Sequence, residues 1–66
     1  MAKKTLRQLR RERDLTQEEL AKLVGLTDRT ISTFETVPGT LKSTKYETIS
    51  KIAKALGVSV DDIFLN

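Results

Sequence analysis

The sequence predicts an all-α fold, a compact bundle of five short helices that forms a single domain over residues 1–66. Three observations support this prediction. Apolar residues recur at the three- and four-residue spacing of amphipathic helices. Threonine or serine followed three residues later by glutamate, glutamine or aspartate marks several helix starts. Isolated glycines stand where two of the helices should end, and no stretch shows a convincing strand pattern or an internal repeat.

The first helix is expected to begin after Thr5, where Gln8 completes a weak capping box. Leu6 and Leu9 supply its apolar face. Arg10 lies about 40° from Leu6 around the helix, at the border of the buried stripe. We expect Arg10 to have an opposite charge nearby, because an unpaired and partly buried charge is expensive.

The second helix is expected over residues 17–24, because Thr16 and Glu19 form a capping box. Its apolar face, with Ala21 at the edge, consists of Leu20, Leu23 and Val24. Gly25 suits the left-handed position that ends a helix and turns the chain. A second short helix directly after such a turn would complete a helix-turn-helix unit.

Thr27 is the cap candidate for this third helix, which runs to Glu35. Ile31 and Phe34 form its buried side, and Glu35 lies at the border beside Ile31, where it can pair with Arg10. The opposite face carries one long cation among short hydrogen-bonding side chains: Asp28, Arg29, Ser32 and Thr33. Such a face can approach another polar object closely, although for an arbitrary helix an ordinary solvated face is the commoner explanation.

The segment after the third helix breaks the helical pattern, and Pro38 and Gly39 suit the second and third positions of a turn. Thr44 and Glu47 form a capping box that predicts the start of a fourth helix, and Gly57 ends it. The core stripe of this helix comprises Ile49, Ile52, Ala53 and Leu56.

Ser59 and Asp62 repeat the capping signal for a fifth, short helix. One face of it is shared by Val60, Ile63 and Phe64. Three further apolar residues have no obvious place in the core: Val37, Leu41 and Leu65. A single exposed leucine is a normal surface residue. Several together, in a chain with a small core, suggest a modest two-fold interface between two copies.

The net charge of +3 is unevenly distributed. Six cations stand among the first 13 residues, against Glu12 alone: Lys3, Lys4, Arg7, Arg10, Arg11 and Arg13. Such a basic segment suits phosphate attraction or serves as a solubilising terminus, and the composition alone favours neither. Its apolar side is too small for a helix that lies on a membrane.

The composition also limits the chemistry of the chain. Without cysteine or histidine, it has no thiolate or imidazole to act as nucleophile, base or metal ligand. We therefore expect no enzyme activity, no metal and no cofactor. No apolar run approaches the roughly 20 residues that span a membrane, and the absence of cysteine fits a cytoplasmic protein.

These features resemble those of the phage repressor and Cro family of helix-turn-helix proteins (the XRE type). The matching motifs are Leu6-Arg7-x-Leu9-Arg10, Leu15-Thr16-Gln17-Glu18-Glu19-Leu20-Ala21, Gly25-Leu26-Thr27, Ile31-Ser32, Phe34-Glu35, Ile52-Ala53-Lys54-Ala55-Leu56-Gly57-Val58 and Asp62-Ile63-Phe64. The resemblance implies that the second and third predicted helices form a helix-turn-helix, of which the third enters the DNA major groove. The chain departs from the family at Asp14, where glycine usually ends the first helix, and in its longer loop over residues 36–44.

The resemblance also implies which residues would contact DNA. Base contacts are expected from the first, second and sixth residues of the third helix, which are Asp28, Arg29 and Thr33. Contacts to the DNA backbone are expected from Gln17, Thr27, Ser32, Lys42, Ser43, Thr44 and Lys45. The family typically joins Arg10 and Glu35 in a salt bridge. Its dimers place two reading helices in successive major grooves about 34 Å apart, and we expect a homodimer joined near Leu65.

Two functions from different classes remain open at this point. The resemblance implies a regulator that binds double-stranded DNA sequence-specifically, as a Cro-like or immunity-type repressor dimer on a palindromic operator, without a small-molecule ligand. The alternative is an antitoxin-type protein-interaction module that sequesters a toxin, with DNA binding secondary. The outward face of the third helix favours the regulator, and 66 residues leave little room for a separate partner-binding domain.

Overall fold

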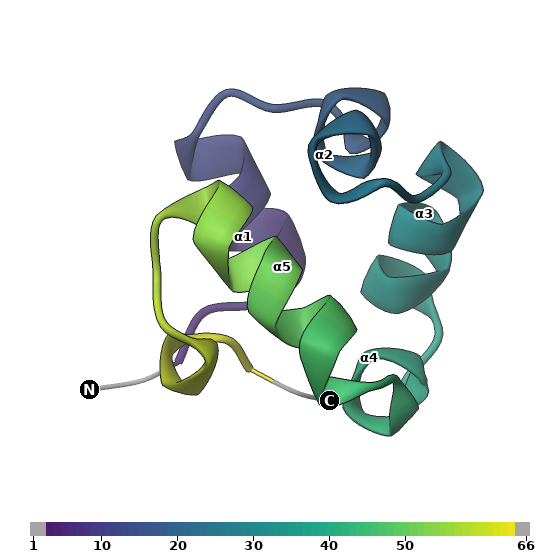
Figure 1. Ribbon diagram of the computed structural model, residues 1–66, viewed down its shortest axis with the longest axis vertical. Coiled ribbons are helices and arrows are strands. Elements are labelled where there is room, and N and C mark those ends of the chain that lie inside the picture. The colour runs from purple at the N-terminus through teal and green to yellow at the C-terminus, as the bar shows by residue number, and fades with distance from the viewer. Residues whose placement is uncertain (1–2, 65–66) are drawn as a thin grey trace.

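The computed structural model describes residues 3–64, and over this range the chain forms five α-helices and one 3-10 turn (Figure 1). They are α1 (Leu6–Glu12), α2 (Gln17–Val24), α3 (Asp28–Thr36), α4 (Thr40–Ser43), α5 (Tyr46–Leu56) and the 3-10 turn η1 (Val60–Asp62). The prediction of an all-α bundle is confirmed. No helix in the described range combines the length and the apolar character that a membrane span requires.

Side-chain caps fix the starts of the first three helices, as predicted. Thr5 Oγ1 accepts a hydrogen bond from the Gln8 backbone N–H at 3.2 Å, and the Gln8 side chain accepts one from the Thr5 N–H at 2.8 Å. Thr16 and Glu19 form the same reciprocal pair at 3.0 and 2.9 Å. Thr27 caps α3 by accepting from a backbone N–H in its first turn. These bonds satisfy donors that a helix start leaves free, so they define where each helix begins.

Two helices end at glycines in the left-handed conformation, α2 at Gly25 with φ 72° and α5 at Gly57 with φ 71°. The next residue then donates its N–H to a carbonyl of the last turn, at 2.8 Å for Leu26 and 3.0 Å for Val58. This Schellman arrangement satisfies a free carbonyl and turns an apolar side chain back towards the core. Asp14 takes the left-handed conformation at φ 54° after α1, and it is the one such residue other than glycine between residues 3 and 64.

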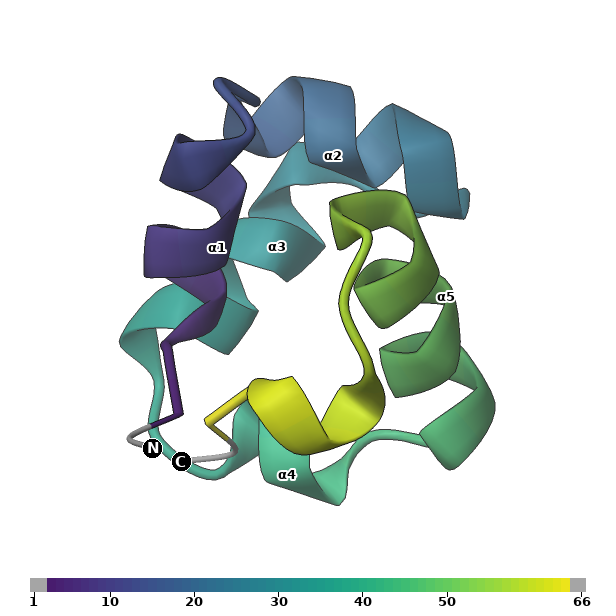
Figure 2. The same cartoon turned by 90° about the vertical axis from the view of Figure 1, so that its left-hand side faces the viewer.

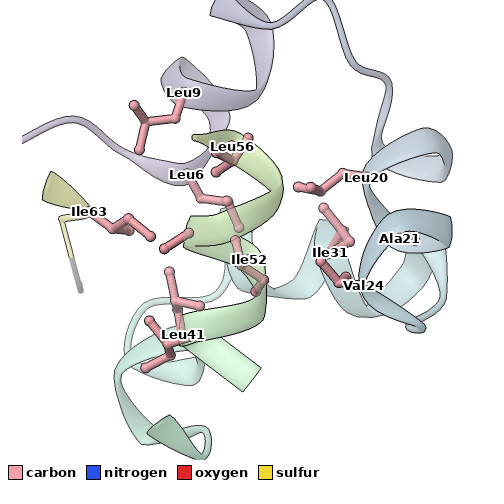
Figure 3. Close-up of a cluster of buried hydrophobic side chains, with 12 residues drawn as sticks. Leu6, Leu9, Leu20, Ala21, Val24, Ile31, Leu41, Ile52, Leu56 and Ile63 are labelled. Carbon is pink, nitrogen blue, oxygen red and sulfur yellow. The ribbon is translucent and has the colours of Figure 1, made fainter. Parts of the chain in front are cut away.

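One hydrophobic cluster holds the helices together (Figure 3). Its members come from all five α-helices and from the segment after η1: Leu6, Leu9, Leu20, Ala21, Val24, Ile31, Leu41, Ile49, Ile52, Ala53, Leu56 and Ile63. The predicted core stripe of α5 is confirmed, since all four of its residues belong to this cluster. Ile52 and Leu56 of α5 have no exposed surface, and the same holds for Leu20 of α2 and Ile31 of α3, so these three helices meet at the centre of the core.

Two residues that we expected in the core are exposed. Leu23 is 61% exposed, because the buried stripe of α2 follows Ala21 and Val24 and Leu23 lies about 100° from Val24 around the helix. Phe64 is 46% exposed, whereas Ile63 has no exposed surface. The helical turn ends at Asp62 and Ile63 is extended, so the two neighbours point to opposite sides of the chain.

The loop predicted between the third helix and the next one contains an additional short helix, α4, which was not predicted. The predicted turn does form, with a hydrogen bond of 3.3 Å from the Thr40 N–H to the Val37 carbonyl and with Gly39 at φ 85°. It reverses the chain and directs Leu41 inward. Leu41 is only 3% exposed, so the expectation that it lies outside the core was wrong.

The predicted start of the helix after this loop was also wrong. α5 begins at Tyr46, and its N-cap residue Lys45 makes no side-chain cap hydrogen bond. The expected capping box of Thr44 and Glu47 does not form. Thr44 instead ends α4 by donating its N–H to the Leu41 carbonyl at 3.3 Å. The extra helix therefore moves the start of α5 by one residue.

The two ends of the described chain are tied together, as Figure 2 shows for the segment before α1 and the turn η1. Lys4 and Ile63 form an isolated parallel bridge. The Lys4 N–H donates to the Asp62 carbonyl at 3.3 Å, and the Phe64 N–H donates to the Lys4 carbonyl at 2.8 Å. The capping signal before η1 is confirmed, because the Asp62 carboxylate accepts from the Ser59 N–H at 3.0 Å.

Candidate nucleic-acid interface

α2 and α3 form the predicted helix-turn-helix, with a short turn from Gly25 to Thr27 between them (Figure 1). Ile31, which has no exposed surface, faces Leu20 and Val24 of α2 in Figure 3. This contact fixes the rotation of α3 about its own axis. The side of α3 opposite Ile31 is therefore held outward by the packing of the core.

Every residue expected on this outward face retains exposed surface. Asp28 and Arg29 are exposed, and Ser32 and Thr33 are half-buried. Within residues 3–64, no hydrogen bond or ion pair engages the Asp28 carboxylate or the Arg29 guanidinium. Thr33 Oγ1 donates to the Arg29 carbonyl at 2.9 Å, so its hydroxyl proton is used within the helix. The face thus offers one cation, one carboxylate and short side chains.

Apart from Ser32 on α3 itself, the residues expected to contact a DNA backbone form two groups. Gln17 is the first residue of α2, and Thr27 immediately precedes α3. Thr27 Oγ1 and Thr30 Oγ1 lie 2.9 Å apart, so the cap hydroxyl is already hydrogen-bonded. The second group surrounds the junction of α4 and α5 and comprises Lys42, Ser43, Thr44 and Lys45. Thr44 is half-buried and the other three are exposed.

Thr40, which was not among the expected residues, connects the second group to α3. Its Oγ1 lies 2.7 Å from the Val37 carbonyl oxygen and 3.0 Å from that of Thr33. The hydroxyl thus joins the start of α4 to the last turns of α3. The turn before Thr40 was visible in the sequence, but a partner seven residues back depends on how the chain folds after that turn.

Glu35 is the centre of a buried polar cluster. Its side chain has no exposed surface, and the side chain of Arg10 is 11% exposed. The expected ion pair is bidentate: Arg10 Nε donates to Oε2 at 2.7 Å and Arg10 Nη2 donates to Oε1 at 3.1 Å. Arg10 Nη1 donates to the Leu15 carbonyl at 2.8 Å. All three nitrogens of this guanidinium are therefore engaged, which compensates for its burial.

Two further donors reach the same carboxylate. Arg7 Nε and Gln17 Nε2 each lie 3.2 Å from Glu35 Oε1, so the cluster joins α1, α2 and α3. Burial alone would raise the pKa of Glu35, but the hydrogen bonds from Arg10, Gln17 and Arg7 outweigh it and hold the pKa below its ordinary value. Arg7 was not expected as a partner, although its position three residues before Arg10 places both on one helix face.

The basic N-terminal segment is less free than its composition indicated. Lys4 pairs with Glu12, and both Arg7 and Arg10 pair with Glu35. The remaining cations of this segment, which have no ion pair in the described range, are Lys3, Arg11 and Arg13. The three paired cations share two carboxylates, so ion pairs within residues 3–64 compensate two of the six positive charges.

A hollow lies at the buried cluster, and its lining is partly polar, because Arg7 and Glu35 belong to it. It has a volume of about 210 Å³, and its lining includes Phe34, Val37, Pro38 and Phe64. Val37 is 49% exposed and Phe64 is 46% exposed. Leu65, the residue we expected in a dimer interface, lies outside the described residues. The part of the chain that the structure describes has no cluster of three potential metal ligands.

Comparison with known proteins agrees with this architecture. A family model described as Helix-turn-helix matches residues 6–63. The chain is similar to the cryptic phage CTXphi transcriptional repressor RstR of Vibrio cholerae, with 43% identity over 58 residues. The matched part is 88% of this chain and 50% of that protein, so the chain spans about half the length of this relative. No solved structure gives a significant match.

Proposed function

This chain belongs to the XRE-type helix-turn-helix family, and we propose that it is a transcriptional repressor that reads an operator with α3. Family membership places it among DNA-binding regulators and not among enzymes. The observation that carries the proposal is the outward face of α3, where Asp28 and Arg29 are exposed and have no partner within residues 3–64. The repressor activity named for the relative from Vibrio cholerae supports the direction of regulation.

Sequence reading is assigned to three residues of α3. Arg29 donates two hydrogen bonds to the O6 and N7 atoms of a guanine, the commonest specific contact in the major groove. Asp28 accepts from a cytosine amino group or orients Arg29. Thr33 contacts a thymine methyl group, which fits a side chain whose hydroxyl proton is already bonded to the helix.

Contacts to the DNA backbone position α3 in the groove. We assign them to residues at the starts of α2 and α3, on α3 itself and at the junction of α4 and α5: Gln17, Thr27, Ser32, Lys42, Ser43, Thr44 and Lys45. The amino ends of helices carry free N–H groups and favour phosphate. Thr40, which is hydrogen-bonded to the Thr33 carbonyl, keeps the junction of α4 and α5 close to the reading helix.

The active form is a homodimer on a palindromic operator. One α3 contacts only half a site, whereas two copies related by a two-fold axis place their helices about 34 Å apart, in successive major grooves. The exposed apolar side chains of Val37 and Phe64 in the hollow at the Glu35 cluster, together with Leu65 after them, supply the interface. This face leaves α3 free to enter the groove.

The first experiment is a selection of bound sites from random DNA, followed by measurement of Arg29→Ala. The substitution should weaken binding to the selected site by about 1–3 kcal/mol and relax the preference at one base pair. Arg11→Ala, which also removes an exposed arginine, is the matched control and should keep the preference. An equal loss of affinity on every sequence would show that Arg29 contacts only phosphate.

The proposed contact between DNA and the junction of α4 and α5 is tested by the salt dependence of binding. Replacing Lys42 and Lys45 together by glutamine should reduce the slope of log affinity against log salt by about two units. Lys51 and Lys54 of α5, replaced in the same way, form a control of equal charge. If both pairs change the slope equally, the effect is that of net charge and the junction does not contact DNA.

The dimer is tested by sedimentation at micromolar concentration, with and without a palindromic site. Leu65→Asp and Phe64→Asp should each lower the mass of the protein in solution and its affinity for the full site, but leave binding to a half site unchanged. A parent that binds the palindrome as a single copy would contradict the dimer and leave the base contacts untouched.

A further inference from the structure

The polar cluster at Glu35 carries more positive than negative charge. Two guanidinium groups, those of Arg7 and Arg10, share the single carboxylate of Glu35. That carboxylate has no exposed surface, and its Oε1 accepts from Arg7, Arg10 and Gln17. One positive charge therefore remains uncompensated within the cluster, and its position is set by which guanidinium is open to solvent.

The open guanidinium is that of Arg7. The side chain of Arg7 is 45% exposed, whereas that of Arg10 is 11% exposed. Arg7 uses only Nε for its bond to Glu35, and within residues 3–64 no hydrogen bond engages its two terminal nitrogens. Arg10 uses all three of its nitrogens. The two terminal nitrogens of Arg7 are thus, within this range, free hydrogen-bond donors at the surface. Nε holds the guanidinium in place through its bond to Glu35.

Gln17 lies next to this guanidinium, because its Nε2 and Arg7 Nε are held by the same oxygen of Glu35. One of the two hydrogens of this amide is used by Glu35, and the second remains for another acceptor. Around α3, Glu35 lies about 60° from Ser32, so the cluster adjoins the outward face of the reading helix.

We propose that Arg7 and Gln17 together bind one phosphate of the DNA backbone, and that Glu35 is the positioning residue that holds both donors. The proposal rests on the DNA-binding function proposed above. A phosphate supplies the negative charge that the cluster lacks, and a guanidinium fork matches its oxygens. Both donors are anchored before DNA arrives, so little side-chain entropy is lost on binding.

The test is the salt dependence of binding to the selected site. Arg7→Gln should reduce the slope of log affinity against log salt by about 0.9, the value for one phosphate contact, and weaken binding equally on all sequences. Arg7→Lys keeps the charge and should retain the slope. Arg11→Gln, an exposed arginine of the same helix without an ion pair in the described range, should change neither quantity.

Gln17→Ala distinguishes a shared phosphate from two separate contacts. If both side chains bind the same phosphate, the double variant Arg7→Gln/Gln17→Ala should lose less affinity than the sum of the two single losses. Additive losses would overturn the shared site. If Arg7→Gln fails to fold in a thermal melt, Arg7→Met, which keeps the length of the side chain and removes its charge, takes its place with and without Gln17→Ala, and additive losses there overturn the shared site equally.

A failure of this inference can be distinguished from a failure of the proposed DNA-binding function. A parent that selects a DNA site, together with an Arg7→Gln slope equal to that of the parent, overturns this inference and leaves the proposed function intact. A parent that selects no site at all overturns the proposed function and the phosphate contact with it. Glu35→Gln, measured below its melting temperature, should weaken binding without lowering the salt slope, because it releases both donors but keeps the charge of Arg7.

Discussion

The helices α1 to α3 and the segment from α4 to α5 are stabilised in different ways. Each of the first three helices begins at a threonine whose side chain caps it. Neither α4 nor α5 has a side-chain cap. The first region is further tied by the Glu35 cluster, whereas α4 is placed by the burial of Leu41. Polar bonds therefore add to the packing of Ile31 in the helix-turn-helix, whereas the second region depends more on apolar packing.

The largest loss of folding stability is expected when the charge of Glu35 is removed. Glu35→Gln leaves the buried Arg10 without a counter-charge, which should destabilise the fold by about 3–5 kcal/mol. The measurement is the free energy of unfolding from denaturant titration. Glu12→Gln removes an exposed pair with Lys4 and should cost less than about 1 kcal/mol. A melting temperature of Glu35→Gln within a degree of the parent would mean that the cluster does not stabilise α1 against α3.

The pH dependence of the unfolding free energy tests the same ion pair while both side chains are present. The pKa of Glu35 lies below its ordinary value in the folded state, so the group contributes stability above the unfolded pKa of about 4.3. This contribution is lost as the pH falls through the folded pKa. Unfolding free energies measured at about pH 7 and about pH 3 should therefore differ less for Glu35→Gln than for the parent. An equal loss in both proteins would assign the acid sensitivity to other carboxylates.

In the segment from α4 to α5, the largest loss of stability should come from truncating a buried apolar side chain. Leu41→Ala opens a cavity where α4 meets the core, and large-to-small changes at such sites cost about 2–5 kcal/mol. Leu23→Ala, at a leucine that is 61% exposed, should stay within about 0.5 kcal/mol of the parent. If the two variants have the same melting temperature, the position of α4 does not depend on Leu41. The packing explanation of this segment is then wrong.

The same division explains what could be predicted from the sequence. The starts at Thr5, Thr16 and Thr27 were predicted correctly, because a cap and its partner lie three residues apart. Arg10 and Glu35 were expected to pair because each borders a buried stripe. Leu41 was placed wrongly, since its burial depends on how a turn directs α4 towards helices that are distant in sequence. The roles of Arg7 and Thr40 depend on the same tertiary geometry, and periodicity alone does not reveal it.

Two threonines, one in each region, test the same difference with a smaller expected change in stability. Thr16→Ala removes a cap that bonds the Glu19 N–H at 3.0 Å and should cost about 1 kcal/mol. Thr44→Ala removes the residue that sequence reasoning assigned as a cap. The Thr44 side chain makes no hydrogen bond in the described range, so this change should stay within about 0.5 kcal/mol. Equal losses in urea titrations would show that the cap pattern at Thr44 is used in solution.

The smallest expected effect is a gain, at the junction between α1 and α2. Asp14 holds a left-handed conformation at φ 54°, which costs an ordinary L-residue about 1–2 kcal/mol and aspartate somewhat less. Asp14→Gly removes this strain, but it also gives the unfolded chain more freedom, which offsets about 0.5–1 kcal/mol. The net stabilisation should therefore lie below about 1 kcal/mol. Asp14→Ala is the control, because it keeps the strain and removes only the carboxylate. Glycine should melt above the parent and alanine at or below it. If alanine stabilises as much as glycine, the gain comes from the lost charge, and the backbone after α1 is not strained.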